Sequence, residues 1–112
     1  MLNLELLKDK YRTVVYCPEA WMAEVLIEEL KKQFGDAVYK NAAGWWDFYG
    51  SETCYWPKIK DKFIAIEYCR KDWFIEKGFR VIDFYDAVPN LNDFGEIEIG
   101  SCNINSLLEI GV

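Results

Sequence analysis

The segment of residues 18–34 places the strongest constraint on the fold of this chain. Its apolar side chains recur at spacings of three and four residues, which puts them on one face of an α-helix. Pro18 suits the first turn of a helix, and Gly35 suits the left-handed position that ends one. We therefore expect a helix whose apolar face packs on a sheet. The residues on that face are Ala23, Leu26, Ile27, Leu30 and Phe34.

Segments rich in β-branched and aromatic residues surround this helix and predict strands. The expected strands cover residues 12–17, 37–40 continued by 45–49, 62–68 and 79–85, and residues 70–77 predict a short helix. The order strand, helix, strand, strand, helix, strand matches an α+β fold, the ferredoxin-like split β-α-β sandwich (βαββαβ). At 112 residues the chain is expected to form one domain (1–112), with a core at 11–86 and an appended segment at 87–112.

The expected last strand is apolar on both of its faces. Phe79 and Val81 point to one face, and Ile82 and Phe84 point to the other. A strand that is apolar on both faces belongs to a sheet that is covered on both sides. We expect this cover to come from helices, from the appended segment, or from a second subunit in a homodimer.

Residues 44–56 hold six of the 19 aromatic residues of the chain. Trp45 and Trp46 are adjacent, and adjacent residues of a strand point to opposite faces, so one of the two rings leaves the core side. Trp21 and Val25 fall on the face of the long helix opposite the apolar one. These side chains are either covered by the chain's own ends or available to a partner. Residues 44–56 are therefore the main candidate for a binding surface.

Catalytic and metal-binding patterns are absent from the sequence. The chain has no histidine, which excludes Ser-His-Asp and Cys-His arrangements and removes the commonest general base. Its four cysteines stand singly, a spacing typical of reduced thiols rather than of a zinc site or a disulfide framework. We interpret Cys17, which precedes the long helix, as a structural thiol rather than a nucleophile. We expect no enzyme activity, no metal and no cofactor.

The net charge of −6 and the pI near 4.6 predict a surface that repels nucleic acid. Lys58, Lys60 and Lys62 alternate and are interpreted as the solvated face of an edge strand rather than a basic patch. No apolar run is long enough to span a membrane, and the N-terminus does not match a signal peptide. We therefore expect a cytoplasmic protein that meets basic surfaces of other proteins.

Residues 17–86 carry a family resemblance. The pattern runs from Cys-Pro-Glu at Cys17, through Trp46-x-x-Tyr49 and Thr-Cys-Tyr at Thr53, to Ile-Glu-Tyr-Cys-Arg-Lys-Asp-Trp-Phe and Gly-Phe-Arg-Val-Ile-Asp-Phe. It resembles small uncharacterised phage and prophage accessory proteins of Gram-positive bacteria, whose tails are usually shorter than the 26 residues that follow Asp86 here. The resemblance implies an accessory protein in the bacterial host cytoplasm. Many such proteins counter host defence by blocking an effector protein or by sequestering a signalling nucleotide.

Two binding hypotheses follow, with a third in which the rings serve structure or self-assembly. In the first, the protein binds and inhibits a host defence effector such as a nuclease, as an anti-CRISPR or similar inhibitor does. The residues expected to carry this contact are Trp21, Val25, Trp45, Trp46 and Tyr49. In the second, the protein is a sponge for a nucleotide-derived immune signal. The residues expected at that ligand site are Thr53, Tyr55, Trp56, Lys58 and Arg70.

Overall fold

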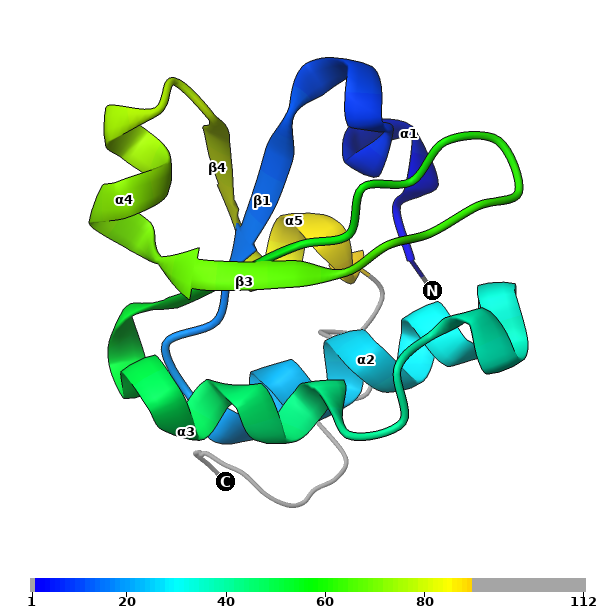
Figure 1. The fold of residues 1–112 in the computed structure, drawn as a ribbon, viewed down its shortest axis with the longest axis horizontal. Helices are drawn as coiled ribbons and strands as arrows, with labels where there is room; N and C mark the ends of the chain where they lie inside the picture. Colours follow the sequence, from blue (N-terminus) through cyan, green and yellow to red (C-terminus); the bar gives the residue numbers. More distant parts are fainter. Residues whose placement is uncertain (1, 90–112) are drawn as a thin grey trace.

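A four-stranded mixed sheet organises residues 2–89, the part of the chain that the computed structural model describes (Figure 1). The strands are β1 (Thr13–Tyr16), β2 (Thr53–Trp56), β3 (Glu67–Arg70) and β4 (Arg80–Asp83). Their order across the sheet is β3-β2-β1-β4. β1 pairs antiparallel with β2 and parallel with β4, and β2 pairs antiparallel with β3. Every described strand is four residues long, so side-chain packing rather than a long hydrogen-bond ladder holds the sheet.

Five short or medium α-helices and four 3-10 turns connect these strands within the described residues. The helices are α1 (Leu4–Leu7), α2 (Ala20–Phe34), α3 (Trp46–Tyr49), α4 (Lys71–Glu76) and α5 (Phe84–Ala87). The 3-10 turns are η1 (Asp9–Tyr11), η2 (Gly35–Ala37), η3 (Ala42–Trp45) and η4 (Gly50–Glu52). None of these helices combines the length and the apolar character that crossing a membrane requires.

The predicted long helix is confirmed as α2. It begins two residues later than Pro18, and Glu19 stands at its N-cap. Gly35 ends it with a φ of 58°, the left-handed region that glycine enters without steric cost. The predicted apolar face is also confirmed. Ala23, Leu26, Ile27 and Leu30 are buried, and Phe34 packs beside them at the helix end.

The two faces of the sheet carry separate apolar clusters. Val15 and Tyr55 belong to the larger cluster, which α2 covers. Val14 and Cys54, their neighbours along the strands, belong to a smaller cluster with Phe74 of α4. Successive residues of a strand point to opposite faces, which explains this division. Helices therefore lie on both sides of the sheet (Figure 1).

The last strand shows the predicted distribution of its side chains. Phe79 and Val81 pack in the smaller cluster, and Ile82 and Phe84 pack in the larger one. The strand itself is shorter than expected, because the chain turns into α5 at Phe84. Residues 90–112, most of the predicted appended segment, lie outside the described residues.

The α+β class is confirmed, whereas the ferredoxin-like strand order is not. In a split β-α-β arrangement a third strand lies between the two strands that a helix connects. Here β1 and β2, which α2 and α3 connect, are direct antiparallel neighbours. The next crossover, through α4, brings β4 to the free edge of β1 in a parallel pairing. The observed order is therefore β3-β2-β1-β4.

One predicted strand is wrong, and the strand predicted at residues 62–68 is confirmed only at residues 67–68, which belong to β3. Residues 37–40 and 45–49 form turns and helix rather than a strand, and Gly50 ends that helix with a φ of 58°. Residues 62–66 belong to the loop before β3 instead of a central strand. In that loop the backbones of Lys60 and Phe63 form two hydrogen bonds of 3.0 and 2.9 Å around a tight turn. Lys58, Lys60 and Lys62 consequently lie on a loop and not on an edge strand.

Candidate functional site

Tyr68 of β3 and four other aromatic rings form one cluster. The Trp45 ring stacks on Tyr68 at a centroid distance of 4.9 Å, and Tyr39 stacks on Trp45 at 5.3 Å. Phe48 and Tyr49 of α3 approach Tyr68 at 6.0 and 5.8 Å. Such distances are those of attractive aromatic pairs. We call these five residues the aromatic face.

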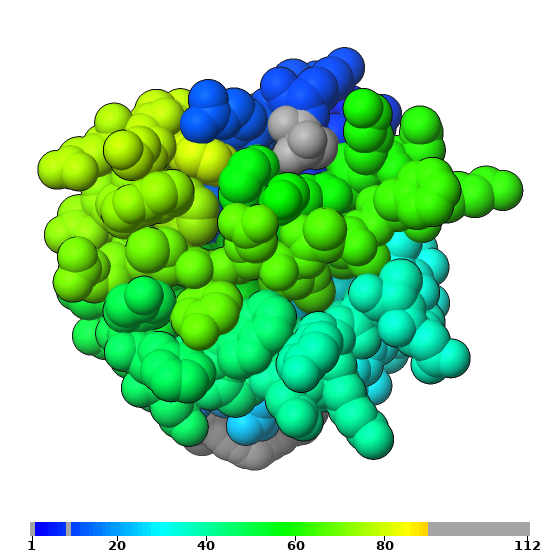
Figure 2. Space-filling view, in the orientation of Figure 1, coloured from blue at the N-terminus to red at the C-terminus, as the bar shows by residue number. Residues whose placement is uncertain are grey.

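Much of the aromatic face is open to solvent. Phe48 is 70% exposed, Tyr39 is 59% exposed and Tyr49 is 37% exposed. Trp45 and Tyr68 are half-buried beneath them. In Figure 2 the teal-to-green residues around α3 and the yellow-green residues of β3 adjoin on the face toward the viewer. A contiguous group of exposed rings, unlike a single exposed residue, indicates a surface that contacts a partner.

The helical period explains how α3 presents its rings. Trp45, Phe48 and Tyr49 stand at positions i, i+3 and i+4, which share one face of a helix. That face meets Tyr68. Trp46 points elsewhere. It is half-buried and donates a hydrogen bond of 2.7 Å from its Nε1 to the backbone oxygen of Cys17.

Two buried hydroxyls tie this helical segment to β2. Tyr55 is fully buried, and its hydroxyl donates to the backbone oxygen of Ala42 at 2.8 Å, with the Ala43 oxygen 3.2 Å away. Thr53 is also fully buried, and its hydroxyl donates to the Gly50 oxygen at 2.7 Å. Backbone groups at both ends of the η3–α3 segment are thus satisfied from one strand. The aromatic face therefore rests on a fixed platform.

The buried thiols and the buried Tyr55 hydroxyl stay protonated at neutral pH. Burial raises the pKa of the Tyr55 hydroxyl, so it remains a donor. Burial likewise raises the pKa of the Cys54 thiol to about 12 and raises the pKa of Cys17. A thiolate is the reactive form of cysteine, so these two thiols are poor nucleophiles.

Charges of both signs border the aromatic face. The Arg70 guanidinium lies 6.0 Å from the Tyr49 ring centroid and 3.6 Å from a carboxylate oxygen of Asp72. Asp47 and Glu52 are exposed on and beside α3. Residues 2–89 contain all 13 Lys and Arg and 15 of the 19 Asp and Glu, a net charge of −2. Residues 90–112 thus carry four of the six net negative charges of the chain. We therefore consider the individual carboxylates near the aromatic face rather than the net charge of the chain.

The residues predicted to bind a protein divide among three places. Trp45 and Tyr49 belong to the aromatic face, and Trp46 is half-buried beneath it. Val25 packs against the larger apolar cluster. Trp21 is 39% exposed and packs edge-on against Phe84 at 5.3 Å, which places it over α5. Only Trp45 and Tyr49 of the five predicted residues thus contribute rings to the aromatic face.

The residues predicted to bind a nucleotide are not gathered into one site. Thr53 and Tyr55 are buried, and their hydroxyls donate hydrogen bonds to backbone oxygens. Trp56 points to the other face of the sheet, where its ring meets Phe79 at 4.6 Å. Lys58 lies 4.9 Å from the Trp56 ring and forms an ion pair of 2.9 Å with Glu67. Arg70 instead borders the aromatic face.

Sequence reasoning missed Tyr39, Phe48 and Tyr68 as surface residues. Tyr68 stands at the end of a segment predicted as a central strand, where a ring is expected to be buried. Phe48 could have been found from its i+3 spacing to Trp45, had the segment been considered as a helix. Tyr39 carries no comparable pattern, because its contact with Trp45 depends on the tertiary fold.

No family model, no curated protein sequence and no solved structure matches this chain. Among the described residues, no cluster of three or more His, Cys, Asp or Glu has a geometry that could hold a metal ion. The site is therefore interpreted from its own geometry.

Proposed function

We propose that this chain is a binding protein that docks on a basic surface of another protein through its aromatic face. The observation that carries the proposal is the exposure of the Phe48 and Tyr39 rings within one contiguous cluster. Aromatic residues are enriched in protein interfaces because they supply large contact areas at a small cost in conformational entropy. The stacked contacts beneath them restrain the rings before binding, which reduces that cost further.

A basic partner fits the chemistry of this surface. The faces of exposed rings attract guanidinium and ammonium groups. Asp47 on α3 and Glu52 on the 3-10 turn that follows it add exposed carboxylates nearby, which suit the same cations. A host defence effector, such as a nuclease with a basic nucleic-acid channel, has such a surface. We therefore propose that the protein inhibits an effector of this kind in the cytoplasm of a Gram-positive host, in keeping with its resemblance to phage accessory proteins.

Differential capture tests the proposal. The immobilised full chain, Phe48→Ser and Phe63→Ser would be exposed to the same Gram-positive lysate, and retained proteins identified by mass spectrometry. Phe63 is a matched control, because it is 76% exposed but lies on the loop before β3. We expect a basic protein that the native chain and Phe63→Ser retain and Phe48→Ser loses. Removing a central apolar anchor should weaken binding by roughly 2 kcal/mol, about 30-fold.

Function is tested on the captured protein after purification. Its activity should fall when the native chain or Phe63→Ser is added, and should be unaffected by Phe48→Ser at the same concentration. Equal capture by all three forms would refute docking through the aromatic face. Light scattering gives a further check, since a homodimer that Phe48→Ser converts to a monomer would assign this face to self-association instead.

A nucleotide sponge is the second candidate function. It is favoured by Tyr39, whose ring stacks on Trp45 and is 59% exposed, so a base could stack on its outer side. Arg70 is the charged group beside this face that could meet a phosphate. A thermal-shift panel of cyclic nucleotides and ADP-ribose derivatives tests it. A stabilisation that Tyr39→Ser abolishes would support this role, and no stabilisation by any of them would exclude it.

A further inference from the structure

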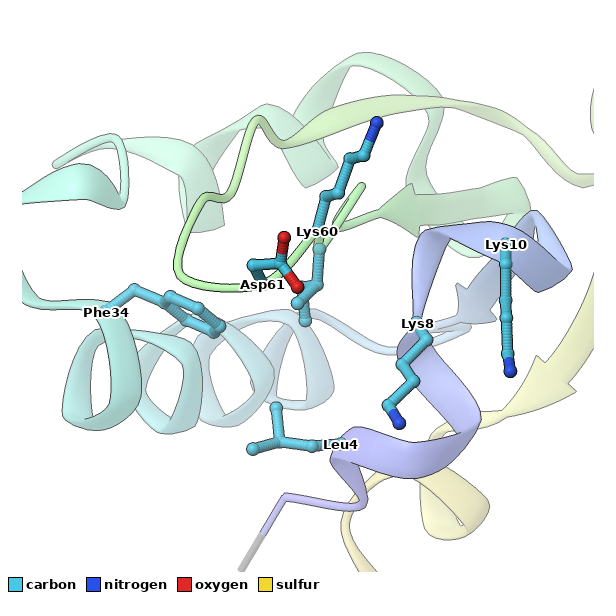
Figure 3. Close-up of a pocket in the computed structure, with 7 residues that line it drawn as sticks. Leu4, Lys8, Lys10, Phe34, Lys60 and Asp61 are labelled. Carbon is cyan, nitrogen blue, oxygen red and sulfur yellow. The ribbon is translucent and has the colours of Figure 1, made fainter.

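A second concave site lies apart from the aromatic face. A cavity of about 560 Å³ opens between the N-terminal segment, the end of α2 and the loop that joins β2 to β3 (Figure 3). Its apolar lining comes from Leu4, Phe34 and Ile59. Its volume falls within the range of pockets that hold small organic ligands. Neither the aromatic face nor the proposed docking function uses it.

The cavity wall is held in a defined and partly strained backbone conformation. Lys8 and Ile59 form a parallel β-bridge that joins the N-terminal segment to the loop. Lys58 and Asp61 have φ values of 51° and 57°, the left-handed region that residues with a side chain rarely adopt. Such conformations cost free energy and persist where surrounding structure imposes them, often at ligand sites. The loop is thus constrained on both sides of Ile59.

Positive charge dominates the described part of the cavity lining. Three lysines, Lys8, Lys10 and Lys60, line it together with one carboxylate, Asp61. Figure 3 shows the Lys8 and Lys10 side chains running in the same direction, whereas the Lys60 ammonium points the other way. The Lys10 ammonium also lies 4.9 Å from the centroid of the exposed Tyr11 ring. Lys8 is also 3.0 Å from a Glu5 carboxylate, but both side chains are at least half exposed. An exposed pair of this kind is weak, so a ligand anion can compete for Lys8.

We propose that this cavity binds a small organic anion with an apolar body. The anionic head would meet the Lys8 and Lys10 ammonium groups, and the body would lie on Leu4, Phe34 and Ile59. The apolar contacts supply affinity through burial, and the two ammonium groups select the charge of the head. The head is a carboxylate, phosphate or sulfonate, because lysine binds each of these as a point charge.

Fluorescence of the full chain with 8-anilinonaphthalene-1-sulfonate tests the proposal, since this probe joins an aromatic body to a sulfonate. We expect saturable binding of one probe per chain. The double variant Lys8→Gln/Lys10→Gln should weaken it roughly tenfold, the combined effect of two exposed charge contacts. Glu5→Gln should strengthen it, because it removes the carboxylate that competes for Lys8. The neutral analogue N-phenyl-1-naphthylamine should bind to the native chain and to the double variant equally.

The controls separate this cavity from the aromatic face. Lys62→Gln/Lys77→Gln removes two exposed charges outside the cavity lining and should leave probe binding unchanged. Phe48→Ser should also leave it unchanged. Probe binding that Phe48→Ser abolishes, or that the Lys8 and Lys10 changes do not affect, would overturn the proposal. Failure here would not affect lysate capture through the aromatic face, so the two proposals fail independently.

Competition identifies the natural head group. Decanoate and phenyl phosphate would each be titrated against the bound probe, with inorganic phosphate as the anion that lacks an apolar body. Displacement by decanoate assigns a carboxylate ligand, and displacement by phenyl phosphate assigns a phosphate ester. Displacement by inorganic phosphate alone, or by none of the three, would overturn the requirement for an anion with an apolar body.

Discussion

Removing the Tyr55 hydroxyl tests the claim that β2 holds the aromatic face in place. Tyr55 is fully buried, and its hydroxyl is 2.8 Å from the backbone oxygen of Ala42, which is itself buried. Tyr55→Phe keeps the ring, so it creates almost no cavity and isolates the effect of the hydrogen bond. The change removes this side-chain donor from the buried Ala42 oxygen, which keeps only the backbone bond of the 3-10 turn Ala42–Trp45.

The expected loss of stability is about 0.5–1.5 kcal/mol, the net contribution of one intramolecular hydrogen bond. With a urea m-value of about 1.5 kcal/mol/M, that loss lowers the unfolding midpoint by roughly 0.3–1 M. The ring contact between Tyr55 and Tyr68, at 6.4 Å, is retained in the variant. A shift of this size is therefore assigned to the hydroxyl and not to packing.

Urea unfolding followed by tryptophan fluorescence measures the effect, with Tyr39→Phe as the matched control. The same atom is removed there from a ring that is 59% exposed, and the expected change is below about 0.5 kcal/mol. Near-ultraviolet circular dichroism of the folded variant adds a second readout, because Tyr55 supports the segment that carries Trp45. Equal midpoints for the two variants would refute the reasoning, and an unchanged aromatic spectrum would show that the hydroxyl does not position Trp45.

Two further predictions concern stability. Burial raises the pKa of Cys54 from 9.0 to about 12 and also raises the pKa of Cys17 and Tyr55. The stabilisation from keeping these groups neutral is complete below pH 9 for the two cysteines and below pH 10 for Tyr55. Above those values it is lost by about 1.4 kcal/mol per pH unit for each group. Urea midpoints that stay constant from pH 8 to 11 would contradict this. Gly50→Ala should cost about 1 kcal/mol in thermal unfolding, because φ is 58° there while the added Cβ meets no atom within 4 Å. Gly44→Ala, equally open but outside that φ region, should be neutral or stabilising.

The sequence predicted α2 but not α3, and the lengths of these two helices explain the difference. α2 could be predicted because fifteen residues display four turns of apolar periodicity and end at a glycine. α3 could not, because a four-residue helix completes only one turn and its aromatic residues favour strands in general. What selects the helix is tertiary, namely the hydrogen bonds from Trp46, Thr53 and Tyr55. Such contacts leave no pattern in the local sequence.

The same error changed the interpretation of the paired tryptophans. On a strand, Trp45 and Trp46 would point in opposite directions, one inward and one outward. On the observed helical segment they are about 100° apart, so Trp46 reaches the Cys17 oxygen and Trp45 stacks on Tyr68. The prediction that one of the two rings leaves the core side is wrong, because both are half-buried and pack against the larger apolar cluster. The helical geometry also adds Phe48 and Tyr49 to the outer side, which alternation on a strand would have separated.

The exposure of Phe48 is best explained by an interaction. Fully burying a Phe side chain is worth about 1.5–3 kcal/mol, and Phe48 is 70% exposed, so most of that free energy is not used in folding. A polar residue at this position of α3 would cost the fold little and would reduce the exposed apolar surface. The rings beside it are already restrained, because Trp45 stacks on Tyr68 and β2 holds the backbone beneath. A partner that covers these rings would bury exposed apolar area, and the restrained rings would lose little conformational entropy on binding. Both effects favour docking as the role of the aromatic face.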